Sequence, residues 1–182
     1  MKVYLARHGQ TNYNELRLCN ADPAVDVHLT EVGFKQAENL AKRLEKVAIE
    51  RVYVSELQRT QQTAKIVNQY HDAPTTIDPR LNDIITGYEG KSADDYHALL
   101  ERAPDMWKVR YNGGESLEDV YNRVLEFIGD LSKEPYTSVL VVTSIPIVQA
   151  FNGIVSQLSG EDAREVEVDK GSCMELEIHM SS

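Results

Sequence analysis

The sequence has few cysteines, no long apolar run and a shortage of positive charge. Its only two cysteines, Cys19 and Cys173, form no metal-ligand spacing, which favours a reducing compartment. No stretch approaches the roughly 18–20 apolar residues of a membrane helix. The N-terminus also lacks the basic and then apolar layout of a secretory signal. We therefore expect a cytoplasmic protein, and a single disulfide between the two cysteines is the lesser alternative.

The charge balance bears on the partners. The chain has 19 lysines and arginines against 29 aspartates and glutamates, a formal net charge of −10. Nucleic acids and membrane surfaces bind basic faces, so this balance argues against both as partners. A pocket for an anionic ligand must then be a local group of arginines and histidines in an acidic protein. The oligomeric state cannot be read from these residues, and a dimer is one alternative.

Length and composition predict one domain. With 182 residues, 42% hydrophobic and 26% charged, the chain has the composition of an ordinary globular protein that buries a real core. We expect a single domain over residues 1–182. Residues 79–115 are rich in glycine and proline and too long for a plain connection, so we interpret them as a small lid insertion.

Short apolar segments alternate with helical patterns along the chain. Strands are predicted at 3–6, 51–54, 75–77 and 139–142. Helices are predicted to begin at Thr30, Ser55, Ser92, Ser116 and Pro146. This order predicts an α/β fold, a three-layer α/β/α sandwich with a mostly parallel central sheet. The last strand alternates apolar Met174, Leu176 and Ile178 with polar residues, which is typical of an edge strand, and its pairing can be antiparallel.

Polar residues that suit phosphate chemistry follow three of these strands. His8 follows the first strand, Arg59 lies just beyond the second, and Ser144 follows the strand at 139–143. Open α/β sheets bind their ligands at the carboxyl ends of the strands. A lone histidine after a strand is more often structural, so the motifs around it decide the interpretation.

Several motifs occur together in a fixed order. They are Arg-His-Gly-Gln-Thr at 7–11 with Asn14, Ser-Glu-Leu-Gln-Arg-Thr at 55–60, Leu-Asn-Asp at 81–83 with Gly-Tyr-Glu-Gly at 87–90, and Gly-Gly-Glu-Ser at 113–116 with Arg123. This order resembles the histidine phosphatase superfamily, the phosphoglycerate mutase-like phosphatases, over nearly the whole chain. An isolated Arg-His-Gly would be weak, whereas the ordered set is specific.

The resemblance implies a role for each matching residue. His8 would attack phosphorus and form a phosphohistidine, while Arg7 and Arg59 would clamp the phosphoryl oxygens. Asn14 would add a neutral hydrogen bond, and Asp83 would act as the general acid, where many members carry glutamate. It implies a small phosphorylated substrate and requires neither a metal nor an organic cofactor.

One part of the family pattern is missing. After the strand at 139–143 the pattern has a second catalytic histidine and two glycines, but this chain has Ser144, Ile145 and Pro146. We interpret Ser144 as the replacement, a neutral donor to phosphate, and natural divergence is favoured over an engineered change. The remaining histidines at 28, 71, 97 and 179 are interpreted as structural or surface residues, not replacements.

Three functions stay open. The first is a phosphomonoester hydrolase that acts through phospho-His8 on a small metabolite, with reduced or specialised activity. The second is a catalytically impaired phosphatase-like protein that binds a phosphorylated ligand or has been recruited to other chemistry. The third, ranked lower, is a phosphoglycerate mutase-type phosphotransferase, because the compact chain lacks the longer insertions of mutases.

Overall fold

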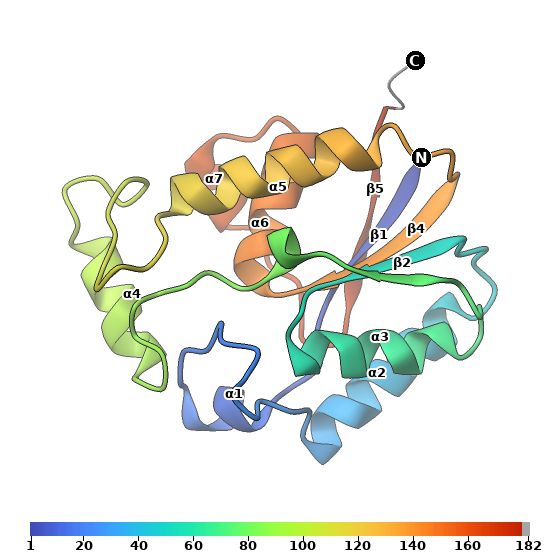
Figure 1. Cartoon of the computed structure of the whole chain (residues 1–182), viewed down its shortest axis with the longest axis horizontal. Coiled ribbons are helices and arrows are strands. Elements are labelled where there is room, and N and C mark those ends of the chain that lie inside the picture. Colours follow the sequence, from blue (N-terminus) through green and yellow to red (C-terminus); the bar gives the residue numbers. More distant parts are fainter. Residues whose placement is uncertain (180–182) are drawn as a thin grey trace.

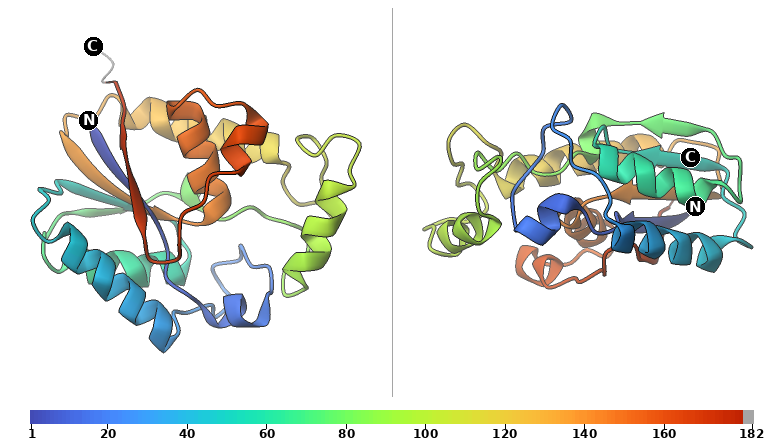
Figure 2. Two further views of the ribbon diagram at one scale, coloured as in Figure 1. Left: turned by 180° about the vertical axis from the view of Figure 1, so that it is seen from behind. Right: turned by 90° about the horizontal axis from the view of Figure 1, so that it is seen from below.

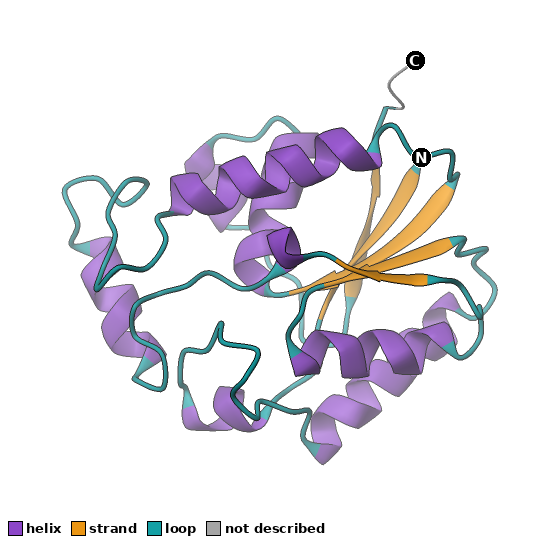
Figure 3. Ribbon diagram, viewed as in Figure 1, coloured by secondary structure: helices purple, strands orange, loops and turns teal. Residues whose placement is uncertain are grey.

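A five-stranded sheet lies between two layers of helices in the computed structural model, which describes residues 1–179 (Figure 1). The strands are β1 (Lys2–Arg7), β2 (Arg51–Val54), β3 (Thr75–Ile77), β4 (Ser138–Thr143) and β5 (Cys173–Glu177). The helices are α1 (Asn12–Leu16), α2 (Glu31–Leu44), α3 (Gln58–Asn68), α4 (Ala93–Glu101), α5 (Leu117–Leu131), α6 (Ile145–Val155) and α7 (Gly160–Arg164), with a 3₁₀ turn, η1, at Pro79–Leu81. Figure 3 shows these elements by type.

The strand order places the predicted site strands side by side. The sheet runs β3-β2-β4-β1-β5, and β1, β2, β3 and β4 are parallel. The edge strand β5 pairs antiparallel with β1, as its alternating sequence allowed. The carboxyl ends of β1, β4 and β2 therefore lie next to one another at one end of the sheet. The prediction of a mostly parallel α/β sandwich is confirmed.

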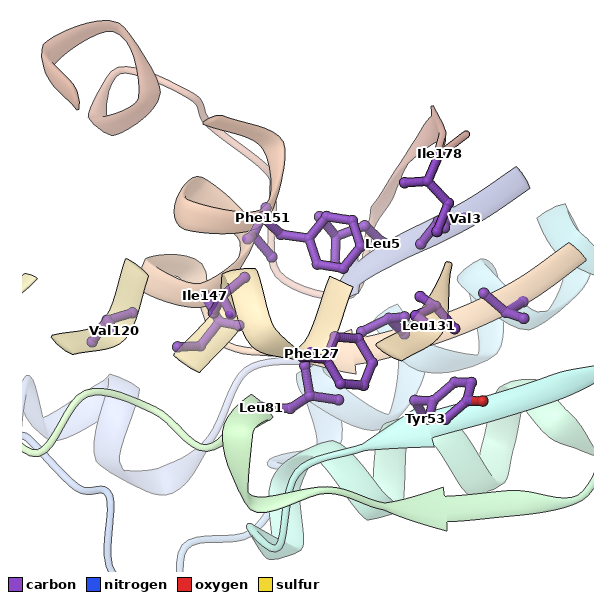
Figure 4. Packing of buried hydrophobic residues seen from close by; sticks show 14 of the residues in the cluster. Val3, Leu5, Tyr53, Leu81, Val120, Phe127, Leu131, Ile147, Phe151 and Ile178 are labelled. Atoms are coloured by element: carbon purple, nitrogen blue, oxygen red, sulfur yellow. The ribbon is translucent and has the colours of Figure 1, made fainter. Parts of the chain in front are cut away.

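Both faces of the sheet are buried. Helices α5, α6 and α7 cover one face, and α2 and α3 cover the other (Figure 1). On the first face Phe127 packs between Tyr53 and Phe151, with ring centroids 5.5 Å and 6.3 Å apart (Figure 4). In β4 Val141 faces this cluster, while Val142 packs with the cluster on the other face. Apolar residues at consecutive positions of β4 thus fill two layers.

Hydrogen bonds to N-cap side chains mark where the helices begin, and one predicted N-cap is wrong. Thr30, Ser92 and Ser116 are N-caps as predicted, and each accepts a hydrogen bond from the backbone N–H three residues on. The prediction that Ser55 caps α3 is wrong, because the N-cap is Leu57. The Ser55 hydroxyl instead accepts from the Leu57 N–H and pairs with the Thr60 hydroxyl. A tight serine turn therefore separates β2 from the helix.

The 79–115 segment extends away from the sheet and carries η1 and α4 (Figure 2). Tyr88, Tyr96 and Tyr111 pack against one another there, with centroids 6.1–6.3 Å apart. Its description as a lid within a single domain stays a prediction. None of the helices in residues 1–179 has the length and apolar character needed to cross a bilayer.

Candidate active site

A cavity of about 240 Å³ opens where β1 and β4 end. Five predicted site residues line it: Arg7, His8, Asn14, Arg59 and Asp83. They come from β1, α1, α3 and the loop after η1, so the fold brings together groups that are far apart in sequence. The apolar part of the wall consists of Leu18, Val27, Ile84, Ala93, Leu100, Leu117, Ile145 and Pro146.

The His8 ring is fixed in one orientation. The side chain is only 4% exposed, and the His8 N–H donates to the Thr143 carbonyl at 3.0 Å, which continues the pairing of β1 with β4. Its Nδ1 lies 2.7 Å from the Gly9 carbonyl oxygen. Because a carbonyl only accepts, Nδ1 carries the hydrogen, and Nε2 of the neutral ring holds the free electron pair. That is the atom a nucleophilic histidine needs.

Two glycines allow helix α2 to approach the chain next to His8. A Cβ on Gly9 would lie 2.4 Å from the Gly33 carbonyl oxygen, and a Cβ on Gly33 would lie 2.0 Å from the Gln10 carbonyl oxygen. Gly9 also donates its N–H to the Thr63 hydroxyl of α3 at 3.2 Å. Helices from one layer thus hold the turn that carries the nucleophile.

The surroundings of His8 keep its ring neutral. Burial is the largest effect, and the positive charges of Arg59, Arg7 and Lys170 add to it, so the pKa of His8 lies well below its usual value of 6.5. The hydrogen bond to Gly9 opposes this shift. A neutral imidazole between cations is poised to take up an electrophilic phosphoryl group whose oxygens the same cations attract.

Arg59 and Asp83 form a buried ion pair beside His8. Arg59 is 4% exposed, and its Nη2 lies 3.0 Å from the Asp83 Oδ2. Arg59 also donates to the side-chain oxygen of Asn20 at 3.1 Å and to its backbone carbonyl at 2.8 Å. Because these acceptors fix the guanidinium plane, an incoming anion meets a charge that is already oriented.

Arg7 and Asn14 complete the polar wall. Arg7 donates from Nη1 to the Val168 carbonyl at 3.0 Å, while its buried Nε finds no partner among residues 1–179. The Asn14 Oδ1 accepts from the Thr11 N–H in the capping box of α1. Its amide nitrogen is the group that can face a ligand. Contact of both residues with phosphate stays a prediction.

Arg123 of α5 holds the loop that carries Asp83. Its guanidinium donates to the carbonyl oxygens of Arg80 and Asp83 and pairs with Glu115 at 2.8 Å. Glu115 in turn accepts from the Ile85 N–H at 2.9 Å. Two backbone carbonyls and one N–H of the loop are therefore bound to a single ion pair, which sets the position of the Asp83 carboxylate.

Ser144 is the predicted site residue that does not line the cavity. It is 1% exposed, and its hydroxyl has no hydrogen-bond partner within residues 1–179. The next two residues, Ile145 and Pro146, line the cavity instead. The wall after β4 is therefore apolar, and a contact between Ser144 and phosphate stays a prediction.

Some lining residues were not predicted from the sequence. Asn20, Thr86 and Arg164 lie in loops or in a helix of five residues, where no periodic pattern marks them. His97, interpreted as a surface residue, is exposed but lies at the cavity wall. Tyr96 also lines the cavity, and burial raises its pKa to about 12, so its hydroxyl stays protonated.

The described part of the chain shows no candidate metal centre. No group of three histidine, cysteine, aspartate or glutamate side chains in residues 1–179 has the geometry of a metal site. Both cysteines are buried and free, so the disulfide alternative is wrong. The arginines of the cavity are suited to a phosphate group.

Comparison with known proteins identifies the family of this chain. The model of the histidine phosphatase superfamily (branch 1) matches residues 3–182. The chain belongs to that superfamily. A Hydrogenobacter thermophilus protein named Phosphoserine phosphatase 1 is 30% identical over 153 residues, covering 79% of this chain and 70% of its own. An Enterobacter sp. (strain 638) protein named Probable phosphoglycerate mutase GpmB is 31% identical over 168 residues, covering 88% and 75%.

Solved structures agree with the family. The alpha-ribazole phosphatase from Shigella flexneri is 26% identical, has a TM-score of 0.82, and is matched over 100% of this chain and 96% of its own. This histidine phosphatase superfamily member therefore acts, as the family does, on small phosphorylated substrates.

Proposed function

We propose that this histidine phosphatase hydrolyses a phosphomonoester of a small metabolite through a phosphohistidine at His8. The observation that carries the proposal is the contact of His8 Nδ1 with the Gly9 carbonyl oxygen, which leaves Nε2 free, in a cavity shared with Arg7 and Arg59. The serine at position 144 predicts reduced or specialised activity, because a protonated histidine there would add a cation that serine lacks. Losing one such donor typically lowers the rate by roughly 10²–10³.

The proposed reaction has two steps. Asp83 enters the cycle protonated, after the substrate phosphate has replaced it as the partner of Arg59. In the first step, His8 Nε2 forms a bond to phosphorus while the ester P–O bond breaks, and Asp83 gives its proton to the departing alkoxide. In the second, the Asp83 carboxylate takes a proton from water, whose oxygen attacks phosphorus and breaks the P–N bond. Inorganic phosphate leaves, and His8 and Asp83 return to their starting states. Arg7 and Arg59 hold the phosphoryl oxygens through both steps.

The test is a search for the covalent intermediate. We expect rapid mixing with a radiolabelled aryl phosphate, followed by alkaline quench, to give a phosphoprotein that is stable to base and labile to acid. His8→Ala should lose both this label and turnover, because it removes the attacking nitrogen. His179→Ala, a surface histidine outside the cavity, is the matched control and should keep both. Turnover equal in the natural protein and in His8→Ala would overturn the proposal.

The second candidate is a phosphate-binding protein without useful turnover. The unpartnered hydroxyl of buried Ser144 and the apolar Ile145 and Pro146 beside it favour this alternative. It predicts that Ser144→His raises the hydrolysis rate at least a hundredfold, while the natural protein binds phosphate with no turnover. Brisk hydrolysis by the natural protein would exclude it. A cytoplasmic location, independence of cofactors and the oligomeric state stay predictions.

A further inference from the structure

The wall of the cavity carries a positive charge that the proposed reaction does not use. Arg164, the last residue of α7, lines the cavity together with His8 and Arg59. It also lines the neighbouring depression, together with Arg7, Gln149 and the acidic residues Glu165, Glu167 and Asp169. A guanidinium at this place is exposed to any ligand whose leaving group reaches beyond the phosphate.

Arg164 forms no ion pair with a carboxylate of residues 1–179, which is also true of Arg7, Arg43, Arg51 and Arg102, whereas Arg17, Arg59, Arg80, Arg110 and Arg123 are paired. Its Nη1 donates to the thioether sulfur of Met106, a weak acceptor. Arg164 is partly buried at the cavity wall, so its charge is available to an anion that enters the cavity.

The backbone around Arg164 is held rigidly. Gln149 of α6 donates from its amide to the carbonyl oxygens of Arg164 and Val166, at 2.7 Å and 3.2 Å. At the start of α7 the Trp107 ring packs directly on Gly160. Helix α7 is thus fixed between α6 and the 79–115 segment (Figure 2, left). A positioned charge gives more selectivity than a mobile surface arginine, because less side-chain freedom is lost on binding.

The cavity that Arg164 shares with the phosphate clamp has both apolar and polar lining. Leu18, Leu100, Leu117 and Ile145 line it together with polar side chains such as Thr86 and Gln149. It can therefore take a leaving group that has both apolar atoms and a polar group. From these contacts we infer that Arg164 is a specificity residue for substrates whose alcohol carries a second anionic group, a carboxylate or a phosphate. The inference deepens the proposed function and rests on it for the place of the reacting phosphate.

Binding of unreactive ligands tests this inference without any need for turnover. The probes are phenylphosphonate, 4-carboxyphenylphosphonate and 1,4-benzenediphosphonate, which share the ring and differ in the second group. We expect calorimetry to give a dissociation constant about 10–100-fold lower for a ligand with the second anion, the usual range for a charge-assisted hydrogen bond. The probe that gains more affinity relative to phenylphosphonate identifies whether a carboxylate or a phosphate is preferred.

Variants assign the preference to Arg164. In Arg164→Gln, the dissociation constants for probes with and without the second anion should differ by no more than about threefold. Arg164→Lys should keep most of the difference because it keeps the charge. Arg102→Gln, which removes an exposed arginine from the end of α4, is the matched control and should behave as the natural protein does. If Arg164→Gln does not fold, Arg164→Met, which also removes the charge but keeps an unbranched side chain, takes its place with the same expected result.

Two results would overturn the inference. One is equal affinity of the natural protein for phenylphosphonate and for the two probes with a second anionic group. The other is an equal loss of affinity for all three probes in Arg164→Gln, which would mean that the residue acts on the reacting phosphate. Hydrolysis of phenyl phosphate is measured separately. No turnover together with an intact preference would contradict the proposed hydrolysis but leave the role of Arg164 standing.

Discussion

At the scale of single residues, the site depends on hydrogen bonds that fix the orientation of the reacting groups. The Gly9 carbonyl fixes the His8 tautomer, and Asn20 with Asp83 fixes the Arg59 guanidinium. Arg123 does the same for the backbone that carries Asp83. These supporting contacts place the reacting groups before substrate arrives, and a displacement of about 1 Å can lower a rate by about 10²-fold.

Arg123 gives the first prediction at this scale. Arg123→Lys keeps the positive charge but cannot bond two carbonyls and Glu115 in one plane. We expect kcat for an aryl phosphate to fall about tenfold or more with little change in KM, because Asp83 is displaced while Arg7 and Arg59 still bind phosphate. Arg110→Lys, at an exposed pair with Asp119, is the control. An unchanged kcat would show that the loop holds its position without Arg123.

At the scale of elements, periodic segments were predictable and short ones were not. The apolar stripe from Leu117 and the alternation from Cys173 extend over enough residues to show their period, and both elements were found. Helices α1 and α7 have five residues each, too few for a periodic pattern, and α7 carries Arg164. The start of α3 was misplaced because Ser55 bonds inside a turn before the helix begins.

The contact between α7 and the 79–115 segment gives an element-scale prediction. A Cβ on Gly160 would lie 2.0 Å from the Trp107 ring, so Gly160→Ala must push the ring away. We expect a loss of about 1–3 kcal/mol of stability from this overpacking. Trp107 is the only tryptophan, so a shift of its fluorescence emission to longer wavelength reports the displacement directly.

The control substitution is expected to change the stability in the opposite direction. Gly129 lies inside α5, and no atom within 4 Å would meet a Cβ there. Gly129→Ala should therefore raise stability by about 0.5–1 kcal/mol through helix propensity, with no change in Trp107 emission. Emission that stays unchanged in Gly160→Ala would mean that α7 and the ring can separate without loss of packing.

At the scale of the whole molecule, strand order determines which residues meet. His8, Arg59 and Ser144 follow strands β1, β2 and β4, which are neighbours in the sheet. Five of the residues that the family resemblance indicated therefore line one cavity. The resemblance could not predict that Ser144 lies beneath the wall while Ile145 and Pro146 form it, because this depends on how α6 begins. The catalytic roles themselves stay predictions.

Burial of the nucleophile makes the stability of the whole molecule depend on pH. The pKa of His8 in the folded protein lies well below 6.5, while the unfolded chain takes up a proton near 6.5. Below that pH the unfolded state binds more protons, so acidification favours unfolding by at most about 1.4 kcal/mol per pH unit. His71, whose pKa burial also lowers, acts in the same direction.

Comparison of variants isolates the contribution of His8. Between pH 6.5 and pH 5 we expect urea unfolding to show that His8→Gln loses about 1–2 kcal/mol less stability than the natural protein, because glutamine takes up no proton in either state. His179→Gln removes an exposed histidine and should follow the natural protein. Parallel curves for all three proteins would mean that His8 takes up a proton in the folded state as readily as in the unfolded chain. That result would contradict the lowered pKa of the buried ring, and the measurement needs no substrate.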